Sequence, residues 1–270
     1  MSPDIHFSAP ALNPDTSEAI YALWDQLAAF PASETRASLD HVLDGVGRLI
    51  DAHHAIWFSM IRLQEKSPDD PMLGWRMGPF HSFRELPLDM DLYKQEAKKV
   101  DMGKPTPCMV SNIKLAGNFR ASIIRERMSE GYIESSYFKA THTARGVRDS
   151  IAVVSSLNAD TEVYCVFYRL LDQSNFNRTD LAIASSALRG LNWFQRRVML
   201  SYGLSLADKP LTRTERRVTR HLLTDMPEKQ IAERLDQSHA TTHKHINSIY
   251  RKFNVNSRSA LMAIWLGERN

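Results

Sequence analysis

The sequence has little of several features that mark particular protein classes. Two cysteines, Cys108 and Cys165, in 270 residues cannot form a disulfide framework or a thiolate zinc site, and they indicate a reducing compartment. The longest apolar runs, residues 150–157 and 163–171, fall far short of the ~20 residues that a membrane-spanning helix needs. The N-terminus lacks the basic and then apolar pattern of a secretory signal. We therefore expect a cytoplasmic chain with no membrane contact.

Sequence motifs of catalysis are also missing. Glycine is scarce, at 11 residues, and the sequence contains no phosphate-cradling glycine loop, nucleophile elbow or HExxH helix. His243 and His245 do not form a metal site with the nearby His239, because residues two apart on a helix point about 200° away from each other and no acidic or cysteine partner completes a set. We expect no enzymatic activity, no metal and no cofactor.

The remaining composition is that of a globular protein, with 43% hydrophobic and 24% charged residues, enough for one large core or two modest ones. The net charge of +3 is unevenly distributed. Residues 208–270 carry 12 Lys and Arg against 7 Asp and Glu, whereas the first 207 residues carry 22 against 24. Concentrated positive charge in the tail favours a polyanionic partner there. A solvated helical surface is the alternative that charge alone leaves open.

A domain boundary is predicted near residue 208. Gly203 and Pro210 interrupt a helical pattern, and every segment that follows is short and helical. We predict an α+β sensing domain over residues 1–202, a linker over 203–210 and an all-helical domain over 211–270.

The first domain alternates helical and extended patterns. Helices are predicted at 17–30 and 34–53, strands at 55–63 and 76–83, helical structure through 89–131, two strands at 147–157 and 161–171, and a long helix at 179–202. Residues 158–160 form a turn signal between two strands rich in Val, Ile, Tyr and Phe, so this pair is expected to be an antiparallel hairpin. The class is α+β, with an antiparallel sheet flanked by helices. The element order resembles the GAF and PAS types of sensory module.

Aromatic side chains of this domain are candidates for an apolar ligand pocket. They are Trp57, Phe58, Trp75, Tyr132, Tyr164 and Phe167. The alternative is that they simply fill the core. Because successive strand residues point to opposite faces, Trp57 and Phe58 cannot share one face, and the pattern does not select which face is the pocket.

The tail is predicted to fold as short helices joined by tight turns. Thr212 and Glu215 have the spacing of a capping box, and Ser238 caps a third helix. Ile246, Ile249, Tyr250 and Phe253 follow the i, i+3, i+4, i+7 spacing of a buried stripe.

The opposite face of that third helix is polar and basic. At about 100° per residue, Ala240, Lys244, Asn247, Ser248 and Arg251 lie away from the apolar stripe. A helix of this kind after a short helix and a tight turn describes a helix-turn-helix reader, which places donors against base edges and phosphates. A packing or protein-binding module is the alternative.

Three segments of the tail resemble the LuxR-type DNA-binding domain without a gap. They are residues 211–218 (LTRTERRV), 229–235 (KQIAERL) and 238–258 (SHATTHKHINSIYRKFNVNSR). The sequence departs from the family pattern at Asp225 and Asp236, where glycines are usual, at Thr219, usually apolar, and at His243, usually Lys or Arg. These departures put the turn geometry and the base preference in question, not the fold.

The resemblance implies a role for each matching position. His243, Lys244 and Asn247 would face bases, and Lys229, Thr241, His245 and Lys252 would approach the DNA backbone. With Ser238 at the helix cap and Arg251 from the exposed face, the predicted contacts to double-stranded DNA are Lys229, Ser238, Thr241, His243, Lys244, His245, Asn247, Arg251 and Lys252. The last helix, with Leu261, Ile264 and Trp265, would form the dimer.

Two kinds of signal receiver fit the first domain poorly. A phosphoreceiver needs acidic residues at strand ends, but Asp69 and Asp70 lie in a proline-flanked loop after a helical N-terminus. Receptors for acyl-homoserine lactones carry a spaced tryptophan, tyrosine and aspartate. Trp57 and Asp70 have that separation, but Ile61 replaces the tyrosine and Glu85 a later aromatic residue, so we attribute the match to chance.

The sequence thus predicts a homodimeric, sequence-specific transcriptional regulator whose first domain senses an unidentified small molecule or partner. Residues 179–202 and the linker would transmit the signal. One alternative is a constitutive DNA binder whose first domain only oligomerises or binds a protein. Another is a protein-interaction adaptor.

Overall fold

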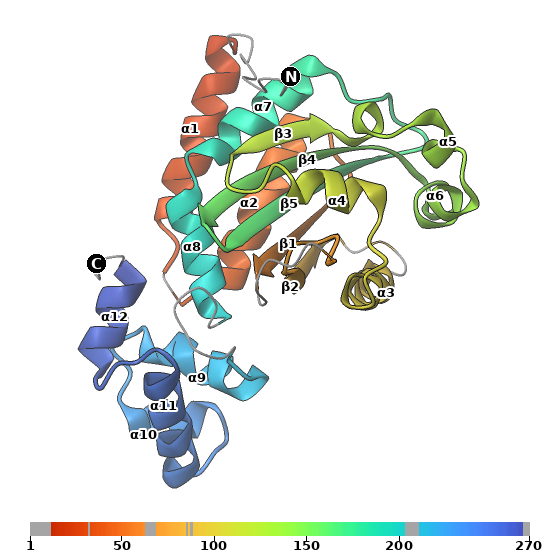
Figure 1. Ribbon diagram of the computed structural model, residues 1–270. Coiled ribbons are helices and arrows are strands. Elements are labelled where there is room, and N and C mark those ends of the chain that lie inside the picture. Colours follow the sequence, from red (N-terminus) through yellow and green to blue (C-terminus); the bar gives the residue numbers. More distant parts are fainter. Residues whose placement is uncertain are drawn as a thin grey trace. The chain divides into compact units, whose positions relative to one another are not determined.

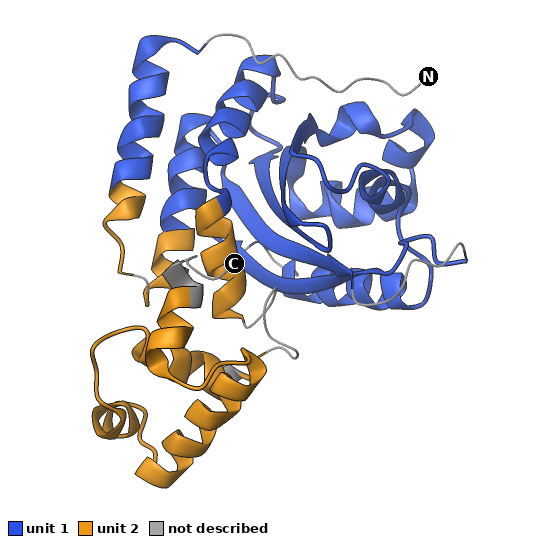
Figure 2. Cartoon of the chain, turned by 60° about the vertical axis from the view of Figure 1, so that its left-hand side comes forward, with its two compact units in different colours: residues 1–25, 40–192 blue, residues 26–39, 193–270 orange. Residues whose placement is uncertain are grey.

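The computed structural model describes residues 12–31, 33–62, 69–84, 86, 89–202 and 211–266. The chain divides into two compact units, which comprise residues 1–25 with 40–192 and residues 26–39 with 193–270 (Figure 2). The predicted linker, 203–210, lies outside the described residues, and the predicted domain boundaries stay a prediction.

The first unit is built on a five-stranded sheet in the order β2-β1-β5-β4-β3 (Figure 1). All neighbouring strands are antiparallel. The strands are β1 (His54–Arg62), β2 (Trp75–Phe83), β3 (Arg120–Ile123), β4 (Val147–Asn158) and β5 (Thr161–Leu170). The α+β class with an antiparallel sheet is therefore confirmed.

The predicted hairpin is the β4–β5 pair. Its register runs from Val147 opposite Leu170 to Asn158 opposite Thr161. At the turn, Asn158 Oδ1 accepts a hydrogen bond of 2.9 Å from the backbone N–H of Asp160, the local side-chain bond that makes Asn favourable in turns.

Helices cover both faces of the sheet. Up to residue 202, the described helices are α1 (Pro14–Ala28), α2 (Thr35–Leu49), α3 (Asp89–Asp101), α4 (Pro107–Ile113), α5 (Glu130–Ile133), α6 (Ser136–Thr141), α7 (Arg178–Arg189) and α8 (Asn192–Ser201), with 3-10 turns η1 (Ile124–Arg127) and η2 (Thr143–Arg145). From Trp193 on, α8 belongs to the second unit. In Figure 1, α3 and α4 lie on one side of the sheet and α2 and α7 on the other.

The two sheet faces bury alternate residues of each strand, as the period of two requires. On β1, Trp57 is fully buried, as is Phe167 on β5, and the two lie near each other because Trp57 pairs with Cys165 and Ala55 with Phe167. Phe58 points to the other face and stacks on Tyr164 with ring centroids 4.8 Å apart.

The prediction of helical structure throughout 89–131 is wrong at residues 120–123. These residues form β3, with Arg120 opposite Val154 and Ile123 opposite Ile151. A strand of four residues has almost no periodic pattern of its own, and its hydrogen-bonding partner lies some thirty residues later in the chain. The pairing with β4 therefore decides its conformation.

The prediction of one long helix over 179–202 is also wrong, because the chain breaks between α7 and α8. In a continuous helix, the carbonyl of Ala187 would accept from the N–H of Leu191. Instead it accepts a 2.8 Å hydrogen bond from Trp24 Nε1, and the Leu191 N–H bonds to the Leu188 carbonyl. Gly190, a poor helix former, lies at the break as the C-cap of α7.

The second unit contains α9 (Arg213–Leu222), α10 (Glu228–Arg234), α11 (His239–Lys252) and α12 (Arg258–Leu266). One cluster of buried side chains joins these helices. Its members from this part of the chain are Leu211, Val218, Leu222, Leu223, Ile231, Leu235, Ile246, Ile249, Phe253 and Leu261. The predicted apolar stripe of α11 is buried as expected, with Tyr250 partly so.

Among the described residues, no helix has the length and apolarity to cross a membrane. The same residues contain no cluster of three or more His, Cys, Asp or Glu side chains able to hold a metal ion.

Candidate DNA-binding surface and ligand cavity

Side-chain caps fix where α9 and α11 begin. The Thr212 hydroxyl accepts from the Glu215 N–H at 3.2 Å, and Glu215 Oε2 accepts from the Thr212 N–H at 2.6 Å, which is the predicted capping box. The Ser238 hydroxyl accepts from the Thr241 N–H at 3.1 Å at the start of α11. Between α10 and α11, Asp236 has a φ of +53°, the left-handed conformation that explains why glycine suits this position.

Glu215 also ties α9 to α11. Its carboxylate accepts hydrogen bonds of 2.7 Å from Lys252 Nζ and 2.8 Å from the Ser248 hydroxyl. Burial opposes ionisation of Glu215, but these bonds and those from Thr212 outweigh it and lower the pKa of Glu215 to about 2. Glu215 therefore holds the third helix in place through charge-assisted bonds.

Arg258 fastens α12 to the end of α9. Its guanidinium donates to the carbonyl oxygens of Leu222 and Met226, both at 2.8 Å, and also to the carbonyl of Thr224. The last carbonyls of a helix have no partner within the helix, so the arginine satisfies groups that would otherwise stay unpaired.

α11 presents an exposed face. Ala240, Lys244, Asn247 and Arg251 are exposed, and Ser248 is half-buried against Glu215. A thin helix with exposed cationic and amide side chains, on a rigid three-helix support, can enter a major groove and offer donors to base edges and phosphates.

The first unit contains a cavity of about 230 Å³ between the sheet and helices α3 to α6. Its walls are mainly apolar and rich in methionine: Met60, Met72, Met77, Met109 and Met128. Methionine is flexible and polarisable, so such a wall adapts to the shape of what it binds. Phe58, Phe80, Tyr93 and Tyr164 form stacked or tilted ring pairs along the same wall.

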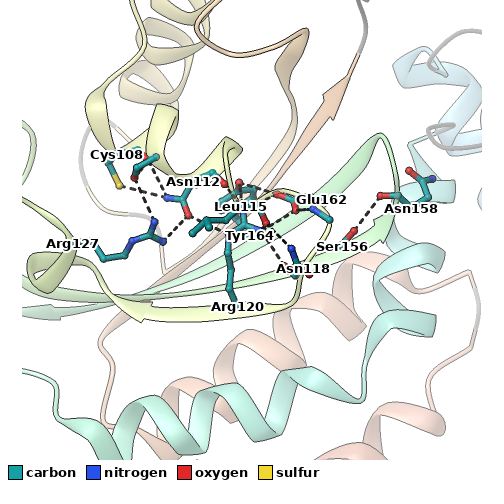
Figure 3. Close-up of polar contacts among 12 residues, drawn as sticks. Cys108, Asn112, Leu115, Asn118, Arg120, Arg127, Ser156, Asn158, Glu162 and Tyr164 are labelled. Atoms are coloured by element: carbon teal, nitrogen blue, oxygen red, sulfur yellow. Dashed lines mark hydrogen bonds and ion pairs between the residues drawn. The ribbon is translucent and has the colours of Figure 1, made fainter. Parts of the chain in front are cut away.

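One wall of the cavity is braced by a buried ion pair. Arg120 donates to Glu162 Oε2 at 2.8 Å and to the Tyr164 hydroxyl at 3.0 Å (Figure 3). Glu162 is fully buried and Arg120 nearly so. Burial and the nearby Glu162 raise the pKa of Tyr164, with Arg120 opposing. Tyr164 therefore faces the cavity as a neutral phenol.

A second buried network surrounds Asp89 on the cavity wall. Asp89 Oδ2 accepts from the Ser82 hydroxyl at 2.7 Å and the Leu86 N–H at 2.9 Å, and lies 3.0 Å from His54 Nε2. The guanidinium of Arg145 pairs with its other oxygen. Because both oxygens have close partners, this carboxylate serves the fold rather than a ligand.

The rest of the lining carries few charges. Burial lowers the pKa of His142 to about 4, although the Phe138 carbonyl opposes the shift, so at neutral pH this ring is uncharged. Burial raises the pKa of Tyr168 to about 12. A ligand in this cavity meets mostly apolar side chains and neutral phenols.

The comparison with protein families decides the identity of the C-terminal unit. The family model described as "GerE: Bacterial regulatory proteins, luxR family" matches residues 209–265. This region is a LuxR-type DNA-binding domain.

The solved structures that resemble this chain include two regulators and one isolated domain. Escherichia coli SdiA has 11% identity and a TM-score of 0.44, covering 93% of this chain and 98% of its own. The N-acylhomoserine lactone dependent LuxR family transcription factor CepR2 from Burkholderia cenocepacia has 12% identity and a TM-score of 0.43, covering 66% and 94%. The VqsR LBD domain from Pseudomonas aeruginosa has 10% identity and a TM-score of 0.45, covering 70% and 98%. No curated protein matches the chain.

Most residues predicted to contact DNA lie on the surface of the LuxR-type domain. The exposed ones are Lys229, Ser238, Thr241, His243, Lys244, Asn247 and Arg251, and His245 and Lys252 are half-buried. Lys252 is already paired with Glu215. The contacts to DNA themselves stay a prediction.

The sequence did not reveal what Glu228 does. Its Oε1 lies 2.9 Å from His243 Nδ1 and 3.8 Å from His239 Nε2. Glu228 of α10 therefore contacts His243, the position where the family usually has Lys or Arg. Fifteen residues separate Glu228 from His243, and no periodic signal spans a turn between two helices.

The predicted dimer helix corresponds to α12. Leu261 is 1% exposed and belongs to the core of its own domain, so it supports the fold of this helix. The side chains of Ile264 and Trp265 lie outside the described residues, and dimer formation stays a prediction.

Three of the six predicted pocket residues line the cavity and three do not. Phe58, Tyr132 and Tyr164 line the cavity, whereas Trp57, Trp75 and Phe167 are not among the lining residues. Trp57 and Phe167 point to the opposite face of the sheet, and Trp75 is 1% exposed in the packed cluster beside Met72. The lining residues that the pattern missed come both from the strands, such as Met60 and Met77, and from α3 to α6, such as Glu96 and Met109.

The two positions that match the lactone receptors lie away from the cavity. Asp70 accepts hydrogen bonds from the backbone N–H groups of Met72 and Gly74, at 3.0 and 2.7 Å, and from Arg76. Burial raises the pKa of Asp70, but these bonds outweigh it and the net shift is downward. Asp70 and Trp57 are thus used by the fold, and Glu85 lies outside the described residues.

Proposed function

We propose that the chain is a sequence-specific transcriptional regulator in which the first unit receives a small molecule and thereby controls DNA binding by the LuxR-type domain. The observation that carries the DNA-binding half is the exposed face of α11, where the side chains of Lys244 and Asn247 are accessible to solvent. The sensing half is supported by the mostly apolar cavity of about 230 Å³, because small-molecule sites are concave and lined mainly by apolar and aromatic side chains with a few polar groups.

The proposed assembly is a homodimer on a pseudo-palindromic site. Two copies of α11 then read two half-sites about one helical turn apart, roughly 34–36 Å. A ligand changes DNA affinity only if it favours one arrangement of the two reading heads over another.

DNA binding is tested by a mobility shift with a pool of duplexes and with the Lys244→Ala and Asn247→Ala variants of the full chain. The expected result is a loss of preference among duplexes, with residual binding that falls steeply as salt rises. Equal binding of wild type and variants to all duplexes would contradict base reading. Salt-independent binding would favour a protein-interaction adaptor.

Sensing is tested by thermal shift of the purified full chain against a metabolite library. A receptor gains stability by RT ln(1 + [L]/Kd), and its DNA affinity changes with the same compound. A chain that binds DNA but responds to no compound would instead be a constitutive binder with an oligomerising first domain.

A further inference from the structure

One corner of the cavity brings a carboxylate together with two phenol rings. Glu96 on α3, Tyr132 on α5 and Tyr137 on α6 all line the cavity, and the centroids of the two rings are 6.2 Å apart. Burial and the nearby Glu96 carboxylate raise the pKa of the Tyr137 phenol. The corner is therefore electron-rich, with an anion and two neutral rings.

The hydrogen bonds of Glu96 are incomplete among the described residues. Oε1 accepts a 2.8 Å hydrogen bond from Lys99 Nζ. Oε2 is buried and receives no well-formed hydrogen bond from any residue that the structure describes. A buried carboxylate oxygen without a donor is unfavourable, so a ligand that supplies a donor here is favoured.

The chain itself seats an ammonium group at this corner. Lys99 Nζ lies 4.2 Å from the centroid of the Tyr137 ring as well as 2.8 Å from Glu96 Oε1. Rings attract cations through their negative faces. Because the Lys99 side chain is 39% exposed, its ion pair is screened by solvent and it approaches from the outside of the cavity.

The other carboxylate of the lining, Asp89, already has close partners for both oxygens. Asp89 and Glu96 are the acidic residues among the described lining, and Asp89 is surrounded by Ser82, Leu86, His54 and Arg145. The rest of the lining is mainly apolar and includes methionine and aromatic side chains. Of the two acidic side chains in the described lining, Glu96 is therefore the one available to a cationic ligand group.

We propose that the ligand of this cavity is a protonated amine with an apolar body. Its ammonium binds Glu96 Oε2 beside the Tyr132 and Tyr137 rings, and its body lies against the methionine-rich wall. This inference rests on the proposed sensing function and names the chemical class that the site selects.

The test uses three eight-carbon probes on the full chain at neutral pH: n-octylamine, 1-octanol and octanoate. The amine is protonated there, as a lysine side chain is. A charge-assisted hydrogen bond exceeds a neutral one, so calorimetry is expected to give an affinity for n-octylamine about tenfold above that for 1-octanol, with octanoate weakest.

Variants locate the preference. Glu96→Gln is expected to bring the two affinities within about twofold while 1-octanol still binds as in wild type, which also reports an intact cavity. Asp91→Asn, an exposed carboxylate on the same helix, is the matched control and keeps the wild-type preference. Lys99→Met is expected to strengthen amine binding, because it removes a neighbouring positive charge.

Several outcomes would overturn the inference. These are equal or tighter binding of the alcohol by wild type, an amine preference that survives Glu96→Gln, and weaker amine binding by Lys99→Met. Failure of all three probes to bind also overturns it. The sensing function is then judged separately by the metabolite library, where a stabilising compound without an amine would retain the function and reject the amine.

Discussion

Two cationic side chains of the LuxR-type domain stand exposed on α11, whereas two arginines of the five-stranded-sheet unit are buried and paired. Lys244 and Arg251 are exposed. Arg120 and Arg169, by contrast, are 6% and 5% exposed, and the guanidinium of Arg169 donates to the carbonyls of Ile50 and Asp51 at 2.7 and 3.2 Å. An exposed cation is available to a polyanion, whereas a buried one is already paired with groups of the protein.

This difference teaches where substitutions will act. Removing a buried charge leaves its partner without a counter-charge in a low dielectric, which costs stability. Removing an exposed one costs little stability and acts through binding.

The largest effect is expected for Arg120→Ala. The variant leaves Glu162 fully buried without its ion pair, and we expect a loss of about 3–5 kcal/mol in the free energy of unfolding, measured by urea denaturation. Arg148→Ala removes an exposed arginine that donates to the Leu171 carbonyl and is the control, with a loss of less than about 1 kcal/mol. Equal losses would erase the distinction between buried and exposed cations.

The next effect concerns binding rather than stability. Lys244→Ala is expected to weaken specific DNA binding by about 1–3 kcal/mol with an unchanged unfolding midpoint. Lys94→Ala, an exposed lysine of α3, should change the affinity for the specific duplex little. A destabilised Lys244→Ala protein would show that this side chain belongs to the fold.

Glu215 is a buried, paired charge that lies within the LuxR-type domain. Its pKa in the folded state, about 2, lies below the ordinary value of 4.5. The stabilisation is therefore present above about pH 4.5 and is lost as the pH falls toward 2. Glu215→Gln should lose about 1–2 kcal/mol at neutral pH and flatten this acid limb in a pH series of thermal melts. An acid limb identical to wild type would assign the limb to other carboxylates.

The smallest effect tests a buried polar contact that carries no charge. Trp24→Phe removes the Nε1 hydrogen bond to the Ala187 carbonyl and should cost about 1 kcal/mol. Gly190→Ala is the companion variant, since an added Cβ would meet the Trp24 ring at 3.4 Å, ordinary contact. If Trp24→Phe were neutral, the break between α7 and α8 would need another cause.

The helices of the LuxR-type domain could be predicted because the sequence patterns that mark them are local. The Thr212 and Glu215 pair, the Ser238 cap and the Ile246, Ile249 and Phe253 stripe each lie within one or two helical turns, and local spacing determines capping and amphipathicity. The β4–β5 hairpin was predictable for the same reason, with its turn at Asn158.

The cavity could be predicted only in part. Strand alternation separates Trp57 from Phe58 but does not say which face is hollow, and Glu96, Tyr137 and Met109 reach the cavity from helices α3, α6 and α4. Helices that pack on a sheet meet it at positions set by the whole topology, so no spacing in the chain marks these residues as neighbours.

The sequence by itself determined the helix starts, the apolar stripes, the hairpin and the polar face of α11, since each depends on residues a few positions apart. Tertiary structure decided that residues 120–123 pair as a strand, that Trp24 ends α7, and that Arg120 meets Glu162 across 42 positions. The physical reason is distance along the chain. A bond between remote residues forms once the sheet has brought them together, and it then overrides the local preference of each segment.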